Sequence, residues 1–286
     1  MSDTEERRGG LVGYVLLLPA GAWLTLFFVV PLVTLVSTSF YDPAGSLELG
    51  YRVTGQVTNY ASVLSDYSEQ FLRSLGYAAT ATLVCVLLGY PLAYAIAFKA
   101  GRWRNLMLVA VIAPFFTSFL IRTLSWQLIL ADQGWVVDTL QFLHLLGEDG
   151  RLLATPVAVV TGITYNFLPF MVLPLYASLE KIDPRLIEAG SDLYASPFTT
   201  FRTVTLPLSL PGLVAGTLLT FIPAAGDYIN AQLLGNTRTQ MIGNVIQKLF
   251  DGGSYPEAAA LSVTLMAVIV VLVLAYVRRA GTEDLV

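Results

Sequence analysis

The sequence predicts an all-α membrane protein with six transmembrane helices and one long polar loop between two of them. The 286 residues are 55% hydrophobic and 13% charged, with a mean hydropathy of +0.67, whereas soluble domains carry roughly 25% charged residues. The uncharged residues gather in long runs. Such runs cross a bilayer only as helices, because lipid offers the backbone no hydrogen-bond partners. Lysine and arginine are also shared unevenly between the connecting segments.

A helix that spans a bilayer needs about 20 mostly apolar residues. We expect six spans, at 11–38, 74–98, 106–130, 153–177, 206–226 and 258–277. The first apolar run is much longer than the 7–15 residues of a signal-peptide core, so we interpret it as a retained helix. The expected parts of the chain are an N-terminal tail (1–10), a first helix (11–38), an external loop (39–73), a core domain (74–277) and a C-terminal tail (278–286).

The connecting segments differ in positive charge. One set of span ends holds ten Lys and Arg residues, and the other set holds five. Because the richer side is cytoplasmic in membrane proteins, both termini and the loop 183–205 are predicted to be cytoplasmic. The segments 40–72, 131–151 and 227–257 are predicted to lie outside. The net charge of −4 argues against a nucleic-acid partner, which needs a basic surface.

The cytoplasmic loop 183–205 contains two helix-start signals. Asp183-Pro184 and Ser196-Pro197 each place a capping side chain before a proline at the first helical position, where the missing N–H costs nothing. We therefore expect two short helices. The second would place Phe198, Phe201 and Thr205 on one side.

The first short helix is expected to be amphipathic. Its apolar face would contain Leu186, Ile187, Gly190, Leu193 and Tyr194. Glycine costs about 1 kcal/mol inside a helix, so we expect Gly190 to let another surface approach closely. Periodicity alone leaves two interpretations open, a hairpin that lies on the lipid headgroups and a docking element for a soluble partner.

The loop resembles the EAA loop of permease subunits in ATP-binding-cassette importers. In that pattern Glu-Ala-Ala is followed after three residues by Gly, and after nine more by Ile-x-Leu-Pro. Gly190 replaces the second alanine and Tyr194 replaces the glycine of the pattern. The matching residues are Glu188, Ala189, Ala195, Ser196, Phe201 and the run Val204-Thr205-Leu206-Pro207.

The resemblance extends to most of 11–277. The segment from Pro223 to Ser262, the segment APFFTSFLIRTLSWQLIL from Ala113, and Leu18-Pro19 are similar to spermidine/putrescine permeases. It implies a type I ABC importer permease fold in a bacterial or archaeal inner membrane. It also implies three partners: an ATPase dimer, a second and different permease, and an extracytoplasmic solute-binding protein. The outer segment 40–72 would form the platform for the binding protein.

The resemblance also implies which loop residues contact the ATPase. Glu188 would be the charged anchor, and Ala189 and Gly190 would permit close approach. For Asp192, a contact and a solvated helix face are both open. The apolar contacts would be Leu193, Tyr194 and Phe198.

Nucleotide chemistry is expected on a partner chain. The sequence has no G-x-x-x-x-G-K-[ST] motif, so it cannot bind ATP by a P-loop. We expect no cofactor on this chain, with ATP and Mg²⁺ bound by the ATPase. The chain is then a transport subunit and not an enzyme. An intramembrane serine protease would need a histidine base in the bundle, and the single histidine, His144, lies in a loop.

Candidate residues for the substrate path are polar or aromatic groups at membrane depth, where such groups are usually functional. Asp227 beside Tyr228 would suit an ammonium group through charge and cation–π attraction; a boundary carboxylate in water is the alternative. Arg122 stands alone in the third span and either pairs with a carboxylate or reaches the outer boundary. Weaker candidates are Trp126, Tyr165, Asn166 and Phe170, which could equally be interface anchors.

The transported molecule stays open at this point. Putrescine, spermidine, another cationic amine or a solute outside the polyamines all fit the sequence. A secondary transporter driven by an ion gradient is a further alternative. Such proteins often show two repeated halves with broken helices, and no repeat is evident in the six spans.

Overall fold

The computed structural model describes residues 17–45, 50–147 and 149–280. They form helices and no strand, apart from one isolated bridge between Tyr41 and Val53. Five helices within this part are long and apolar enough to span a membrane: Leu17–Thr38, Thr58–Lys99, Pro156–Leu179, Pro197–Ala225 and Tyr255–Arg279. A bent pair of helices supplies the sixth candidate. The predicted all-α membrane fold is confirmed, although residues 11–16 of the first expected span lie outside the described residues.

The chain divides into two compact units. The first unit contains residues up to Asp66 together with Lys248–Thr264. Within it, Asn59 Nδ2 donates to the carbonyls of Ser39 (3.0 Å) and Tyr41 (2.9 Å), and Tyr51 OH donates to Gly253 O. These bonds join residues of the first unit that are far apart in the sequence. The first unit holds η1 (Thr25–Val29), α2 (Val30–Thr38), the start of α3 (Thr58–Tyr94), and parts of α12 (Ile242–Asp251) and α13 (Tyr255–Ala280).

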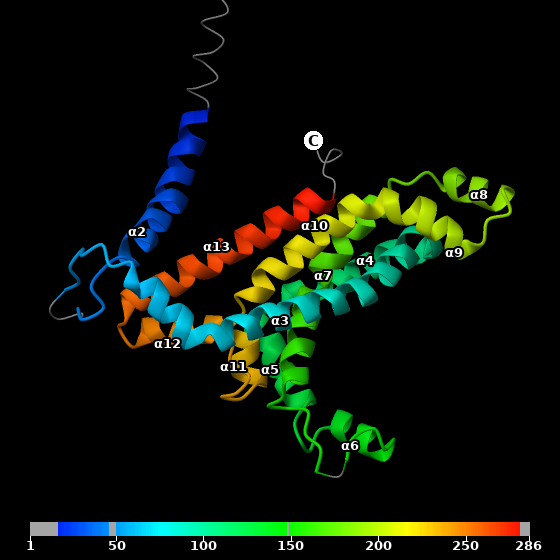
Figure 1. Cartoon of the computed structure of the whole chain (residues 1–286). Coiled ribbons are helices and arrows are strands. Elements are labelled where there is room, and N and C mark those ends of the chain that lie inside the picture. Colours follow the sequence, from blue (N-terminus) through cyan, green and yellow to red (C-terminus); the bar gives the residue numbers. More distant parts are fainter. Residues whose placement is uncertain (1–16, 46–49, 148, 281–286) are drawn as a thin grey trace, which may run out of the picture. The chain divides into compact units, whose positions relative to one another are not determined.

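The second unit contains Tyr67–Gln247 and the residues from Leu265 onward. Its helices begin with the rest of α3, which leads into η2 (Ala95–Lys99), and they include the two short helices of the loop 183–205, α8 and α9 (Figure 1). The other elements are η3 (Gly101–Trp103), α4 (Arg104–Ile112), η4 (Ala113–Phe116), α5 (Phe119–Ile129), α6 (Trp135–Phe142), α7 (Pro156–Leu179), α8 (Pro184–Asp192), α9 (Pro197–Thr200), η5 (Phe201–Thr205), α10 (Leu206–Ala225) and α11 (Ile229–Leu234).

Glycines let α7 and α10 pack closely side by side (Figure 1). A Cβ on Gly212 would lie 2.5 Å from Pro174 O, and a Cβ on Gly216 would lie 2.9 Å from Met171 Sδ. Small residues allow this approach, and close van der Waals contact is the main attraction between helices in lipid.

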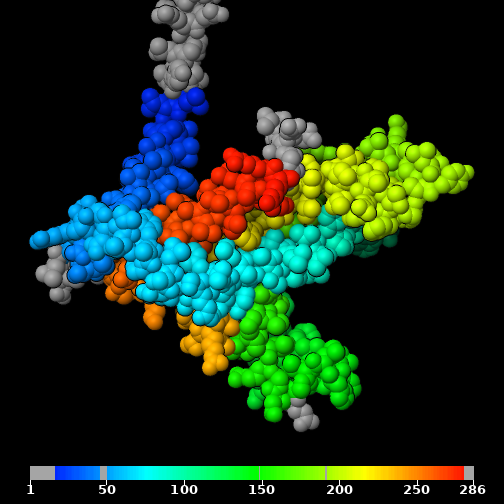
Figure 2. Space-filling view, viewed as in Figure 1, coloured from blue at the N-terminus to red at the C-terminus, as the bar shows by residue number. Residues whose placement is uncertain are grey.

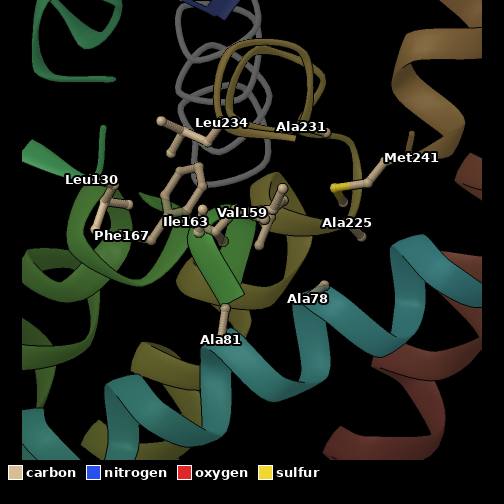
Figure 3. Packing of buried hydrophobic residues seen from close by; sticks show 12 residues of the cluster. Ala78, Ala81, Leu130, Val159, Ile163, Phe167, Ala225, Ala231, Leu234 and Met241 are labelled. Atoms are coloured by element: carbon tan, nitrogen blue, oxygen red, sulfur yellow. The ribbon is translucent and has the colours of Figure 1, made fainter. Parts of the chain in front are cut away.

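A buried cluster fills the end of the second unit near α11 (Figure 3). Ala78 and Ala81 enter it from α3, Ile163 and Phe167 from α7, and Leu234 from α11. The cluster joins elements that are far apart in the sequence and holds the short helix α11 against α7.

Two expectations about the elements need correction. Residues 58–73, expected as part of an external loop, are helical, because this polar stretch continues into the second span with a single irregular residue at Tyr67 (φ −120°, ψ 17°). The expected span 106–130 is broken by a 97° bend. The first part ends at Phe116, because Thr117 and Ser118 adopt extended backbone (ψ 149° and 141°).

Candidate functional site

The loop 183–205 forms the two short helices that its caps predict. The Asp183 carboxylate accepts the backbone N–H of Arg185 (3.0 Å), and the Ser196 hydroxyl accepts that of Thr199 (3.1 Å). After α9, η5 continues directly into α10, so that Pro197–Ala225 is one long helical segment. The second short helix is therefore continuous with a membrane-spanning segment, whereas α8 is joined to it by a turn.

The surface that approaches Gly190 belongs to this chain. A Cβ on Gly190 would lie 2.8 Å from Oγ1 and 2.9 Å from Cγ2 of Thr200. Thr200, the last residue of α9, is 5% exposed and packs between the two short helices. Gly190 therefore sets the packing of α8 on the second short helix.

The end of α8 explains the departure at Tyr194. Tyr194 has φ +57°, and the Ala195 N–H reaches Gly190 O across it (3.0 Å). This is the left-handed helix ending in which glycine is usual. The EAA pattern has glycine at this position, and the chain keeps the same turn with a tyrosine.

The loop exposes a large apolar surface, named here the loop patch: Leu186, Leu193, Tyr194 and Phe198. Their exposed fractions are 48%, 80%, 98% and 72%. The carboxylate residues Glu188 and Asp192 are also exposed, as is Ala189. The loop projects from its end of the second unit (yellow-green in Figure 2). Contiguous exposed apolar side chains of this kind mark an interaction surface.

Two of the predicted path residues line a cavity. Trp126 and Tyr165 face a cavity of about 710 Å³ between α3, α5 and α7, with their ring centroids 5.4 Å apart. The lining of this cavity also includes three residues with hydroxyl groups, Tyr77, Thr161 and Thr164. No carboxylate is among the lining residues. Phe170 instead packs edge-on against Phe115, at 5.1 Å between ring centroids.

Asp227 and Asn166 belong to a buried polar network beside this cavity. Asp227 accepts the backbone N–H groups of Ile229 (2.9 Å) and Asn230 (3.1 Å), and its second oxygen accepts Asn230 Nδ2. Asn166 Nδ2 donates to Asn230 Oδ1 and to Thr123 Oγ1, both at 3.2 Å. The network ties α5, α7 and α11 together.

Asp227 is buried, and this burial changes the pKa of its carboxyl group. The residue is 7% exposed, so the expected alternative of a boundary carboxylate in water is wrong. Burial raises the pKa of the carboxyl above its ordinary value, and the hydrogen bonds from Asn230 and Ile229 lower it in part. Tyr228 is 37% exposed and lines neither the cavity nor the network. The structure thus does not place the Asp227–Tyr228 pair together around a ligand.

Sequence reasoning missed Thr123 and Asn230, which complete the polar network. Asn230 had one usable signal, an amide three residues after an Asp at the start of a short helix, which is a capping arrangement. Thr123 had no such signal, because its contacts with Asn166 and Asn230 join residues far apart in the chain. Arg122 is 8% exposed and has no ion-pair partner among the described residues. The same residues contain no cluster of three or more His, Cys, Asp or Glu side chains suited to a metal ion.

Comparisons with known proteins agree with this architecture. Residues 86–280 match the family model described as "Binding-protein-dependent transport system inner membrane component". The spermidine/putrescine transport system permease protein PotB of Salmonella typhimurium (strain SL1344) is 39% identical over 262 residues, covering 90% of each chain. Its Escherichia coli (strain K12) counterpart is 38% identical and covers 90% of this chain and 94% of the relative. The inner membrane ABC transporter permease protein YdcU of Escherichia coli (strain K12) is 33% identical, covering 96% and 91%.

A solved structure supports the fold. A bacterial ABC transporter that imports the acidic polysaccharide alginate superposes with a TM-score of 0.71 over 98% of each chain, at 20% identity. At that identity the likeness shows a shared fold.

Proposed function

Because the chain belongs to the family of binding-protein-dependent transport system inner membrane components, we propose that it forms the membrane path for a polyamine such as spermidine or putrescine. Relatives 36–39% identical and named as spermidine/putrescine permeases support the choice of polyamine. In this proposal an extracytoplasmic binding protein delivers the solute, and a separate ATPase dimer supplies energy from ATP and Mg²⁺. A second, different permease completes the path. Both termini lie in the cytoplasm.

The observation that carries the proposal is the exposed loop patch at the start of a continuous span. Leu193, Tyr194 and Phe198 would fill an apolar groove of the ATPase, and Glu188 would be the charged anchor beside them. Ala189 adds a small side chain that permits close approach. Asp192 is exposed on the same helix, and both a contact and a solvated position fit it. Rigid continuity with α10 would convert closure of the ATPase into movement of the bundle.

The cavity fits a cation in transit. Aromatic faces such as those of Trp126 and Tyr165 attract ammonium groups, and threonine hydroxyls accept their hydrogen bonds. The lining lacks a carboxylate, which keeps binding weak, and a path needs weak binding for release. Asp227 and Asn166 would act indirectly, by holding α5 in position through the network with Asn230 and Thr123.

ATP-dependent uptake tests this function. The chain, its ATPase and its companion permease would be reconstituted in proteoliposomes with the binding protein outside and ATP inside. We expect uptake of radiolabelled spermidine or putrescine that requires both ATP and the binding protein. Uptake of a different solute alone would support the non-polyamine alternative. Uptake by this chain alone, driven by an ion gradient, would support a secondary transporter and overturn the proposal.

A further inference from the structure

A buried arginine lies at the break between α4 and α5. Arg122 is 8% exposed, and its Nε and Nη1 are enclosed without a hydrogen-bond partner in the described part of the chain. The guanidinium carbon lies 5.3 Å from the ring centroid of Phe115 and 5.6 Å from that of Phe119, which stand on opposite sides of the break. Two aromatic faces attract a desolvated cation but do not satisfy its N–H donors.

The first turn of α5 adds to the positive potential. Ser118 is the N-cap residue and makes no side-chain cap bond. The backbone N–H of Arg122 donates to Ser118 O (3.1 Å). The backbone N–H groups of residues 119–121, at the start of the helix, therefore have no partner within the helix. The N-terminal end of a helix has a partial positive charge. The buried guanidinium and the uncapped helix end both lie in the first turn of α5, and both favour a negative charge nearby.

The break lies within the expected third span and is exposed on this chain. From Arg104, α4 and η4 rise by about 20 Å, which is less than the hydrocarbon thickness of about 30 Å. Phe116 is 88% exposed, and Thr117 and Ser118 are exposed as well. Irregular backbone at this depth does not face lipid, because its polar groups would be unsatisfied. Protein or water must cover it.

We propose that the break is the contact with the companion permease, and that a membrane-embedded carboxylate of that subunit pairs with Arg122 through Nη2, because Nε and Nη1 are enclosed by this chain. This inference rests on the proposed function, which requires a second permease. Charge complementarity selects an anion and excludes the cationic solute. A phospholipid phosphate would leave the break against lipid. The proposed function pairs this chain with a second, different permease, and the carboxylate is assigned to that chain.

Arg122→Gln and Arg122→Lys test the pairing. Each tagged variant would be co-expressed with the companion permease and the ATPase, and companion recovered per tagged chain would be measured by quantitative mass spectrometry. The matched control is Arg102→Gln, whose guanidinium lies 5.4 Å from the Trp103 ring at an exposed site. We expect Arg122→Gln to reduce recovery by about tenfold, since an unpaired buried carboxylate would remain on the companion. Arg122→Lys should recover most of it, and the control should match the wild type.

A second measurement does not depend on a charge change. A photo-crosslinking amino acid at Ile121, which is 59% exposed, should capture the companion permease. Crosslinks to lipid alone, or equal companion recovery by Arg122→Gln and the wild type, would overturn the pairing. If the wild-type chain recovers the ATPase and a companion, the proposed function stands whatever Arg122 does. If it recovers neither, the proposed function itself fails.

Discussion

Tyr194 shows how one backbone angle changes the role of a side chain. Its φ of +57° lies in the left-handed region, which costs a residue with a Cβ about 1 kcal/mol or more. The residue is also 98% exposed, so its ring projects away from the protein. A residue that is both strained and exposed suggests a functional reason for the side chain, and the proposed ATPase contact supplies one.

Tyr194→Gly and Tyr194→Ala separate the backbone from the ring. Glycine adopts the left-handed turn freely, whereas alanine keeps the strain, and both remove the ring. We expect amide hydrogen exchange in the last turn of α8 to be up to about fivefold slower in the glycine variant than in the alanine variant. Both variants should bind the ATPase more weakly than the wild type. Equal exchange in the two variants would contradict the left-handed turn.

Asp227 gives a pH-dependent prediction at the same scale. A carboxyl with a higher pKa in the folded chain binds its proton more tightly there. Its contribution to stability is therefore fully present below the ordinary value of 3.8 and is lost as the pH rises through the raised pKa. The melting temperature of the purified protein should thus fall across this window.

Asp227→Asn should flatten that pH dependence, because the amide keeps an oxygen acceptor for the backbone cap and has no charge to bury. The measurement is the melting temperature in detergent from about pH 4 to about pH 8. Asp138→Asn, at an exposed carboxylate on α6, is the control and should keep the wild-type profile. A slope that persists in Asp227→Asn would show that another group causes it.

At the scale of elements, the contacts of α7 hold the second unit together. Gly212 and Gly216 bring α10 against it, and the Arg104 guanidinium at the start of α4 pairs with Glu180 and donates to Tyr176 OH near its end. These contacts hold α4 and α10 firmly. In contrast, α5 is held partly by the polar network through Asn166 and Asn230.

Gly212→Ala should loosen the packing of α10 on α7. The new methyl group would lie 2.5 Å from the Pro174 carbonyl oxygen and from Ser178 Cβ, and backbone cannot move aside cheaply. We expect a loss of about 1–3 kcal/mol, measured as a lower melting temperature in detergent. Gly76→Ala on α3 is the matched control, because nothing lies within 4 Å of its new Cβ. That change should be neutral or stabilising, and an equal loss in both variants would contradict this packing.

At the scale of the whole molecule, the charge bias and the loop patch suggest one direction of force. The side rich in Lys and Arg contains the loop 183–205, and the loop is continuous with a membrane span through η5. Two features that arise from different parts of the sequence thus agree with an energy source on the cytoplasmic face.

Glu188→Arg tests this coupling. Reversal of the anchoring charge should weaken ATPase association and abolish uptake, while the protein still inserts in the membrane. Association would be measured by co-purification in mild detergent, and uptake in proteoliposomes. Asp138→Arg reverses an exposed carboxylate on the side predicted to be external, so it should leave ATPase association unchanged. Normal uptake by Glu188→Arg would show that Glu188 is not the anchor.

The sequence by itself determined the features that depend on neighbouring residues. Long apolar runs predicted the spans, and the Asp183 and Ser196 caps predicted both short helices, because capping needs only residues two or three positions apart. The glycine at 190 indicated a close approach but not which surface approaches.

Only the tertiary structure decided the rest. The structure placed the 97° break at Thr117–Ser118 and the contact of Thr200 with Gly190. It also formed the polar network, in which Thr123, Asn166 and Asn230 are far apart in the chain. The physical reason is that a buried polar group needs a hydrogen-bond partner, and packing alone decides which distant residue supplies it. Among the described residues, Arg122 is buried and has no carboxylate partner, which the sequence could not reveal.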